Sequence, residues 1–123
     1  MKKRFITLPV LTLAVVFVFS ACEPDFVGNK IKRGNEYSLS FSVLNRTEKE
    51  TLSLKKGQEL NVSLTLEKGT VSLRIGRKDK PAIYTGTDLE SADFAVVVPE
   101  NGRYIISVSG KGAKGKAEFD AVG

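Results

Sequence analysis

The chain has 123 residues, with 19 Lys and Arg against 14 Asp and Glu and a formal net charge of +5. It contains one cysteine and no histidine or tryptophan, which excludes an intrachain disulfide and any chemistry that needs an imidazole as base or metal ligand. Loss of residues 1–21 would remove three cations, leave 16 basic residues against 14 acidic ones and lower the charge to +2. The composition therefore gives no case for nucleic-acid binding.

The N-terminal segment has the pattern of an export signal. Three cations at residues 2–4 precede an apolar run over residues 5–19, and the small residues Ser20 and Ala21 lead to Cys22. The run is shorter than the roughly 20 residues that a spanning helix needs. The segment resembles the lipobox of bacterial lipoproteins, which implies cleavage before Cys22 and a diacylglyceryl group on its sulfur.

This resemblance implies a location. Two or three acyl chains, each stabilised in the bilayer by about 0.8 kcal/mol per buried methylene, hold a protein on a membrane. Glu23 follows Cys22, whereas lipoproteins kept at the inner membrane of double-membraned bacteria typically have Asp there. We expect the outer membrane in such an organism, and the outward face of the plasma membrane in a single-membraned one.

The expected domain division is a signal over residues 1–21, the lipidated Cys22 with a tether over residues 22–36, and one domain over residues 37–123. The tether segment mixes Pro24 and two glycines with charged residues, and we expect at most one short strand in it, over residues 26–32. The length of the remaining chain suits one core.

Alternating apolar and polar residues predict half-buried strands over the first half of the domain, at residues 37–43, 52–54, 60–66 and 71–75. Residues 55–58 and 67–70 separate three of them with charged side chains and a glycine, which indicates hairpin turns.

The second half begins with residues 76–93, in which we expect a cationic loop, a short strand over residues 83–85 and an acidic stretch. The clearest predicted hairpin follows, with strands over residues 94–98 and 104–108 joined by a Pro-Glu-Asn-Gly turn. A basic, glycine-rich loop over residues 110–116 and a last strand over residues 117–121 end the chain.

Seven or eight short strands without helices predict an all-β antiparallel sandwich, with a small barrel as the alternative. The residues expected to point into its core are Tyr37, Leu39, Phe41, Val43, Leu52, Leu54, Leu60, Val62, Leu64, Leu66, Val71, Leu73, Ile75, Phe94, Val96, Val98, Tyr104, Ile106, Val108 and Phe119. We expect the Tyr104 hydroxyl to bind backbone, as in a tyrosine corner.

The segments LNVSL, GTVSLRI, VVVP and GRY, at residues 60–64, 69–75, 96–99 and 102–104, resemble bacterial pre-peptidase C-terminal domains. The resemblance covers roughly residues 50–109 and implies a secreted β-sandwich module. That family often has aspartates beside the second strand, where this chain has Thr70 and Ser72, which argues against a calcium site here.

Catalysis is the class of function that the composition weakens most, since the lone thiol is expected to carry lipid. The close acidic residues Asp88, Glu90 and Asp93 match neither an EF-hand loop nor an acid/base pair, and we interpret them as a solvated loop. No catalytic residue, cofactor or metal is predicted.

Candidate partner contacts are Tyr84, the tyrosine outside the predicted inward set, and the loop cations Arg77, Lys78 and Lys80. Further cations precede and follow them, at Lys30, Lys32 and Arg33 and at Lys111, Lys114 and Lys116. Convergence of these groups on one face would suit an anionic polymer or lipid surface.

The sequence thus predicts a membrane-anchored, extracytoplasmic lipoprotein that acts as a non-catalytic binding or interaction module of the cell envelope. Its partner would be an envelope protein or an anionic polymer, with no role for nucleic acid. Two alternatives are an inhibitor or immunity-type protein that blocks a partner with the loop of residues 76–93, and a binder of anionic envelope polymers or lipids.

Replacement of Cys22 by Ser tests the anchor. The variant lacks the sulfur that would receive lipid, so after export and processing it should leave the membrane fraction and appear as soluble protein. Fractionation of cells followed by immunodetection measures this. A variant that stays membrane-bound after processing would instead indicate an ordinary signal with an incidental cysteine or another mode of attachment.

Overall fold

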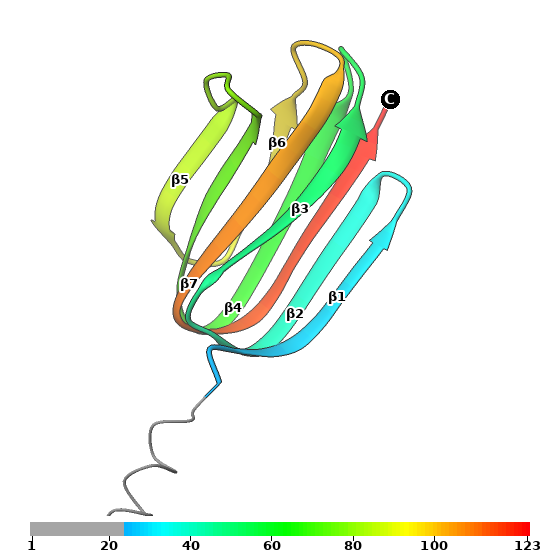
Figure 1. Cartoon of the computed structure of the whole chain (residues 1–123). Helices are drawn as coiled ribbons and strands as arrows, with labels where there is room; N and C mark the ends of the chain where they lie inside the picture. Colours follow the sequence, from blue (N-terminus) through cyan, green and yellow to red (C-terminus); the bar gives the residue numbers. More distant parts are fainter. Residues whose placement is uncertain (1–23) are drawn as a thin grey trace, which may run out of the picture.

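Two long strands, β4 (Glu59–Arg77) and β7 (Gly102–Val122), organise the fold of residues 24–123, the part of the chain that the computed structural model describes. Each bends near its middle and continues into a second layer (Figure 1). They pair with one another along most of their length, from Glu59 opposite Val122 to Arg77 opposite Tyr104. The signal over residues 1–21 and Cys22 lie outside the described residues.

The other strands flank this long pair on both sides, and all pairings are antiparallel. They are β1 (Phe26–Arg33), β2 (Glu36–Leu44), β3 (Thr47–Leu54), β5 (Tyr84–Leu89) and β6 (Ala92–Val97). The all-β prediction is confirmed. Within residues 24–123 no helix is long and apolar enough to cross a membrane.

One continuous hydrogen-bonded sheet therefore forms both layers. The five-strand layer has the order β1, β2, the second half of β7, the first half of β4, and β6. The four-strand layer has the order β3, the first half of β7, the second half of β4, and β5. The described sheet is open, with a path that ends at β1 and β5, which favours the sandwich over the barrel.

The bends replace a turn and a loop predicted from the sequence. Residues 67–70 are a bulged bend inside β4, with register shifts on both sides of Lys68, and residues 110–116 are a bend inside β7. At Gly69, where φ is +71°, a Cβ atom would meet the carbonyl oxygens of Lys111 and Gly112. Glycine allows this left-handed conformation and this backbone approach, and a glycine in a strand marks a bulge as readily as a turn.

The predicted hairpin of residues 94–98 and 104–108 is also wrong. β6 pairs with β4, whereas the first half of β7 pairs with β3 and β4, so residues 99–101 cross from one layer to the other. Residues 55–58 cross beside them: the Gly57 amide donates to the Val98 carbonyl and the Val98 amide donates to the Gln58 carbonyl, both at 2.9 Å. Alternation fixes which side chains are buried but leaves open which strands pair.

The core follows the predicted alternation closely. Of the expected inward residues, Val43, Leu66 and Phe94 are half-buried, and the others are buried. Leu44 is buried in place of Val43 because the pairing of β2 with β7 shifts register between Phe41 and Leu44. The alanines Ala113, Ala117 and Ala121 also belong to the core. The Tyr104 hydroxyl donates to the Glu100 carbonyl at 2.6 Å, which confirms its expected backbone contact.

The short strand expected over residues 26–32 is confirmed as β1, and it is part of the sheet. Residues 26–33 form a full edge strand along β2, and the Asn45 amide donates to the Asp25 carbonyl at 2.7 Å. The described sheet therefore begins at Phe26 rather than at Tyr37, and few residues separate it from Cys22.

Gly69→Ala tests the importance of the bends. The added methyl group would crowd the neighbouring backbone, and alanine also disfavours the positive φ of residue 69. We therefore expect the free energy of unfolding to fall by about 2–4 kcal/mol, measured by urea titration of the soluble Cys22→Ser protein. Gly57→Ala is the matched control, since φ is +91° there but nothing lies within 4 Å of the added Cβ. Equal losses in the two variants would contradict a structural role for the close approach.

Candidate binding surface

The outer face of the five-strand layer carries two hollows and a group of carboxylates. On β2, β4, β6 and β7 its residues alternate with residues that face the core, and the strand register arranges the outer residues of all five strands in rows. One row runs from β6 to β1 through Asp93, Ser63, Glu118, Ser38 and Ile31; the next runs through Ala95, Asn61, Asp120, Glu36 and Arg33.

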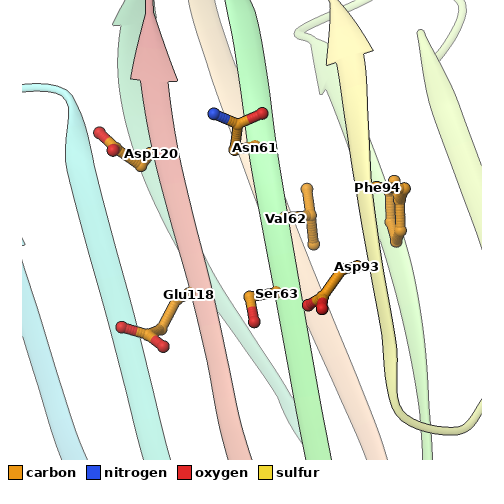
Figure 2. Close-up of a pocket in the computed structure, with 7 residues that line it drawn as sticks. All are labelled: Asn61, Val62, Ser63, Asp93, Phe94, Glu118 and Asp120. Carbon is orange, nitrogen blue, oxygen red and sulfur yellow. The ribbon is translucent and has the colours of Figure 1, made fainter.

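Two neighbouring hollows lie on this face, on either side of β7. The first, of about 560 Å³, has Asn61, Ser63 and Asp93 on its β4 and β6 side (Figure 2). The second, of about 310 Å³, has Ile31, Arg33, Glu36 and Ser38 on its β1 and β2 side. Glu118 and Asp120 of β7 line both hollows. In one row the longer side chain of Glu118 lies between the short ones of Ser63 and Ser38.

The face is acidic although the described chain is net basic. Residues 24–123 contain 16 of the basic residues and 13 of the acidic ones. The outer face carries two cations, Arg33 and Lys116, against five carboxylates: Glu36, Glu59, Asp93, Glu118 and Asp120. The outer face of the four-strand layer instead carries Lys49, Arg74 and Arg103 among serines and threonines. The two faces of the sandwich therefore differ in charge.

Most of these carboxylates have no cationic partner among the described residues. Lys116 pairs with Glu118 at 3.5 Å, whereas no ion pair forms at Glu36, Asp93 or Asp120. Glu36 and Asp120 lie directly opposite one another on β2 and β7, and like charges in that position are destabilising. The arrangement offers several charged hydrogen-bond acceptors to a ligand from outside.

The acidic residues that the sequence grouped together are separated in the structure. Asp88 pairs with Lys111 at 3.1 Å, Glu90 lies in the turn between β5 and β6, and Asp93 belongs to the acidic outer face. Among the described residues no three His, Cys, Asp or Glu side chains are placed to hold a metal ion.

The cations whose convergence would suit an anionic ligand lie in three separate places. Lys30, Lys32 and Arg33 are on β1, Lys78 and Lys80 are in the turn after β4, and the cations of residues 111–116 are at the bend of β7. Several are also paired with carboxylates: Lys30 with Glu48, Lys32 with Glu50, and Arg77 with Glu100. The structure brings them to no common face.

Two of the candidate contact residues have structural partners. The half-buried Tyr84 ring packs on Phe94, with centroids 4.7 Å apart, and so joins the two layers on the β5 and β6 side. The Arg77 guanidinium lies 5.8 Å from the centroid of the Tyr104 ring and binds Glu100 at 2.8 Å. Lys78 and Lys80 are exposed. Of residues 76–93, the candidate blocking loop, residues 78–83 and 90–91 lie outside the strands.

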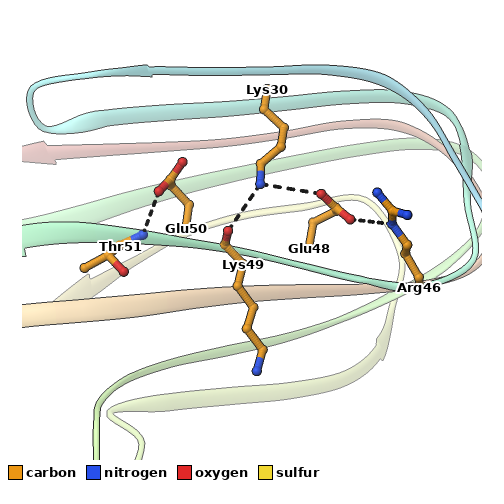
Figure 3. Close-up of polar contacts among 6 residues, drawn as sticks. All are labelled: Lys30, Arg46, Glu48, Lys49, Glu50 and Thr51. Atoms are coloured by element: carbon orange, nitrogen blue, oxygen red, sulfur yellow. Dashed lines mark hydrogen bonds and ion pairs between the residues drawn. The ribbon is translucent and has the colours of Figure 1, made fainter.

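A polar cluster joins the layers on the opposite side of the sandwich (Figure 3). Lys30 of β1 reaches β3, where it pairs with Glu48 at 3.5 Å and donates to the Lys49 carbonyl at 3.2 Å. Arg46 also binds Glu48, which is 8% exposed. Cations that point inward from an edge strand protect that edge against pairing with another chain.

Tyr37 lies behind this cluster with an unsatisfied hydroxyl. Its ring stacks on Phe119 at 5.6 Å, and its buried oxygen has no hydrogen-bond partner in the described chain. Burial raises the pKa of Tyr37 well above its usual range, and the nearby Glu50 and Glu48 raise it further. The neutral phenol is thus strongly favoured in the folded protein.

Comparisons with known proteins found no matching family model and no matching curated protein. Among solved structures, one similar chain is PliG of Aeromonas hydrophila, a periplasmic inhibitor of g-type lysozyme. The match has 14% sequence identity and a TM-score of 0.45, and it covers 77% of this chain and 86% of the other.

Replacement of Tyr37 by Phe should leave the free energy of unfolding unchanged or raise it by about 1 kcal/mol, because it removes a buried group without a partner. Tyr104→Phe, the matched control, loses its bond to Glu100 and should cost about 1 kcal/mol. Urea titrations measure both variants. Equal destabilisation would show that the Tyr37 hydroxyl has a favourable contact.

The pH dependence of stability in the Tyr37→Phe variant gives a second test. Because the folded-state pKa of Tyr37 is raised, its contribution to stability is complete below the unfolded pKa, near 10, and is lost as the pH rises above that value. Between about pH 8 and 11 the Tyr37→Phe protein should lose less stability than the wild type. Identical losses would contradict the raised pKa.

Proposed function

We propose that the protein is a lipid-anchored, extracytoplasmic binding module of the cell envelope with no chemistry of its own. The support for the anchor is the N-terminal pattern that ends at Cys22. The support for binding is the acidic outer face, where four carboxylates line two hollows and all but Glu118 have no ion-pair partner among residues 24–123.

The face favours a partner with cationic groups. Hydrogen bonds between a cationic donor and a carboxylate are shorter and stronger than neutral ones, and opposite charge also speeds diffusional encounter. The two hollows lie on either side of β7, and neighbouring strands are about 4.8 Å apart, so two cationic side chains about 10 Å apart could occupy both. A basic surface of an envelope protein fits this description.

The two alternatives have less support. A binder of anionic polymers would need the cations on one surface, and they lie in three places with several of them paired. An inhibitor that acts through residues 76–93 would have to use a short segment, since most of that stretch is in β4, β5 and β6. Blocking of a partner by the acidic face itself is compatible with the proposal.

Removal of two charges on the face tests the proposal. Glu118 and Asp120 of β7 line both hollows, and the double substitution Glu118→Gln with Asp120→Asn keeps the shape of each side chain but removes its charge. After in-cell crosslinking of the lipidated protein, the partner recovered with the wild type should be lost or reduced at least about tenfold, as expected for loss of about 1.4 kcal/mol of binding.

The matched control removes two exposed carboxylates elsewhere, by Glu67→Gln with Glu90→Gln near the bends. It should recover the partner as well as the wild type does. Equal recovery by all three proteins would overturn the acidic face as the binding surface. Recovery of anionic polymer rather than protein, unaffected by either change, would favour the alternative of an anionic ligand.

A further inference from the structure

The bends of β4 and β7 gather at one end of the sandwich with two turns, β2–β3 and β5–β6, and this end is here called the bend end. The Gly110 amide donates to the Arg46 carbonyl and the Gly112 amide donates to the Asn45 side chain, which joins the β2–β3 turn to β7. The Ser91 hydroxyl accepts from the Leu66 amide at 2.9 Å and joins the β5–β6 turn to β4. The turns at residues 34–35, 55–58, 78–83 and 99–101 lie at the far end (Figure 1).

The described chain begins at the bend end and is fixed there. The Asp25 carbonyl accepts from the Asn45 amide at 2.7 Å, and the Arg46 guanidinium lies 5.4 Å from the centroid of the Phe26 ring. Three residue steps separate Cys22 from Asp25, and a chain of that length spans at most about 11 Å. Any group attached to the Cys22 sulfur is therefore held close to this end of the domain.

The bend end has little net charge. Its cations are Arg46, Lys68, Lys111 and Lys114. An equal number of carboxylates lies among them, at Asp25, Glu67, Asp88 and Glu90. Anionic lipid therefore attracts this end only weakly. The short chain between Cys22 and Asp25 instead determines which end meets the membrane.

We propose that the bend end lies against the phospholipid headgroups and that the sandwich stands upright on the membrane, an inference that rests on the proposed lipidation of Cys22. The first half of β7 runs from the far end to the bend, and at about 3.3 Å per residue it places the far end about 25–30 Å away. Both outer faces then stand roughly perpendicular to the bilayer, so a partner of the acidic face must approach from the side.

The natural absence of tryptophan allows a direct test. Lys114→Trp places a fluorophore at the bend end, and Lys56→Trp, with the same change of charge, places one at the far end. Each lipidated protein is reconstituted into phosphatidylcholine vesicles that contain headgroup spin-labelled lipid. The Lys114→Trp protein should lose most of its fluorescence, at low and high salt alike, whereas the Lys56→Trp protein should lose none.

A control insertion tests the role of the short link. A flexible Gly-Ser segment of ten residues between Pro24 and Asp25 adds a root-mean-square reach of about 17 Å and should relieve the quenching of the Lys114→Trp protein. Equal quenching of both proteins, or stronger quenching at the far end, would overturn the orientation while vesicle flotation still showed the anchor. Failure of the lipid-dependent flotation itself, with Cys22→Ser as reference, would overturn the anchor and the orientation together.

Discussion

The close approach of two backbones, Gly69 of β4 against Lys111 and Gly112 of β7, is the constraint on which the rest of the structure depends. It allows two long paired strands to bend together, so that one sheet supplies both layers of the sandwich. The bend fixes which halves of β4 and β7 share a layer. It therefore decides that Ser63, Glu118 and their neighbours form one outer face.

The sequence predicted burial well and connectivity poorly, for a physical reason. Alternation reports directly on which side chains face the core, as at Tyr37, Phe41 and Tyr104, all of which are buried. It contains no information on which strand lies beside another, so the predicted hairpin between β6 and β7 was wrong. Glycine at Gly69 signalled a change of backbone direction but could not distinguish a bulge inside a strand from a turn between two strands.

The candidate surface was beyond sequence reasoning because its members come from every strand of the five-strand layer. Glu118 and Asp120 flank the buried Phe119 in the sequence, so alternation predicts that they point outward. That Ser63 and Glu36 lie beside them follows only from the strand register, which the sequence does not reveal. Sequence proximity instead grouped Asp93 with acidic residues that lie elsewhere. It also placed the strand expected over residues 26–32 in a tether, because nearly every residue of this edge strand is exposed and its sequence shows no alternation of apolar and polar residues.

The central claim is that the acidic outer face is where the protein meets its partner. Site-specific photocrosslinking in the native envelope tests it most directly, with the reactive group at Asn61 on this face or at Ser53 on the outer face of the four-strand layer; both positions are exposed. We predict one recurrent adduct from Asn61 and none from Ser53. Adducts from Ser53 alone, or none from either position while the same probe near the bends captures a partner, would contradict the account.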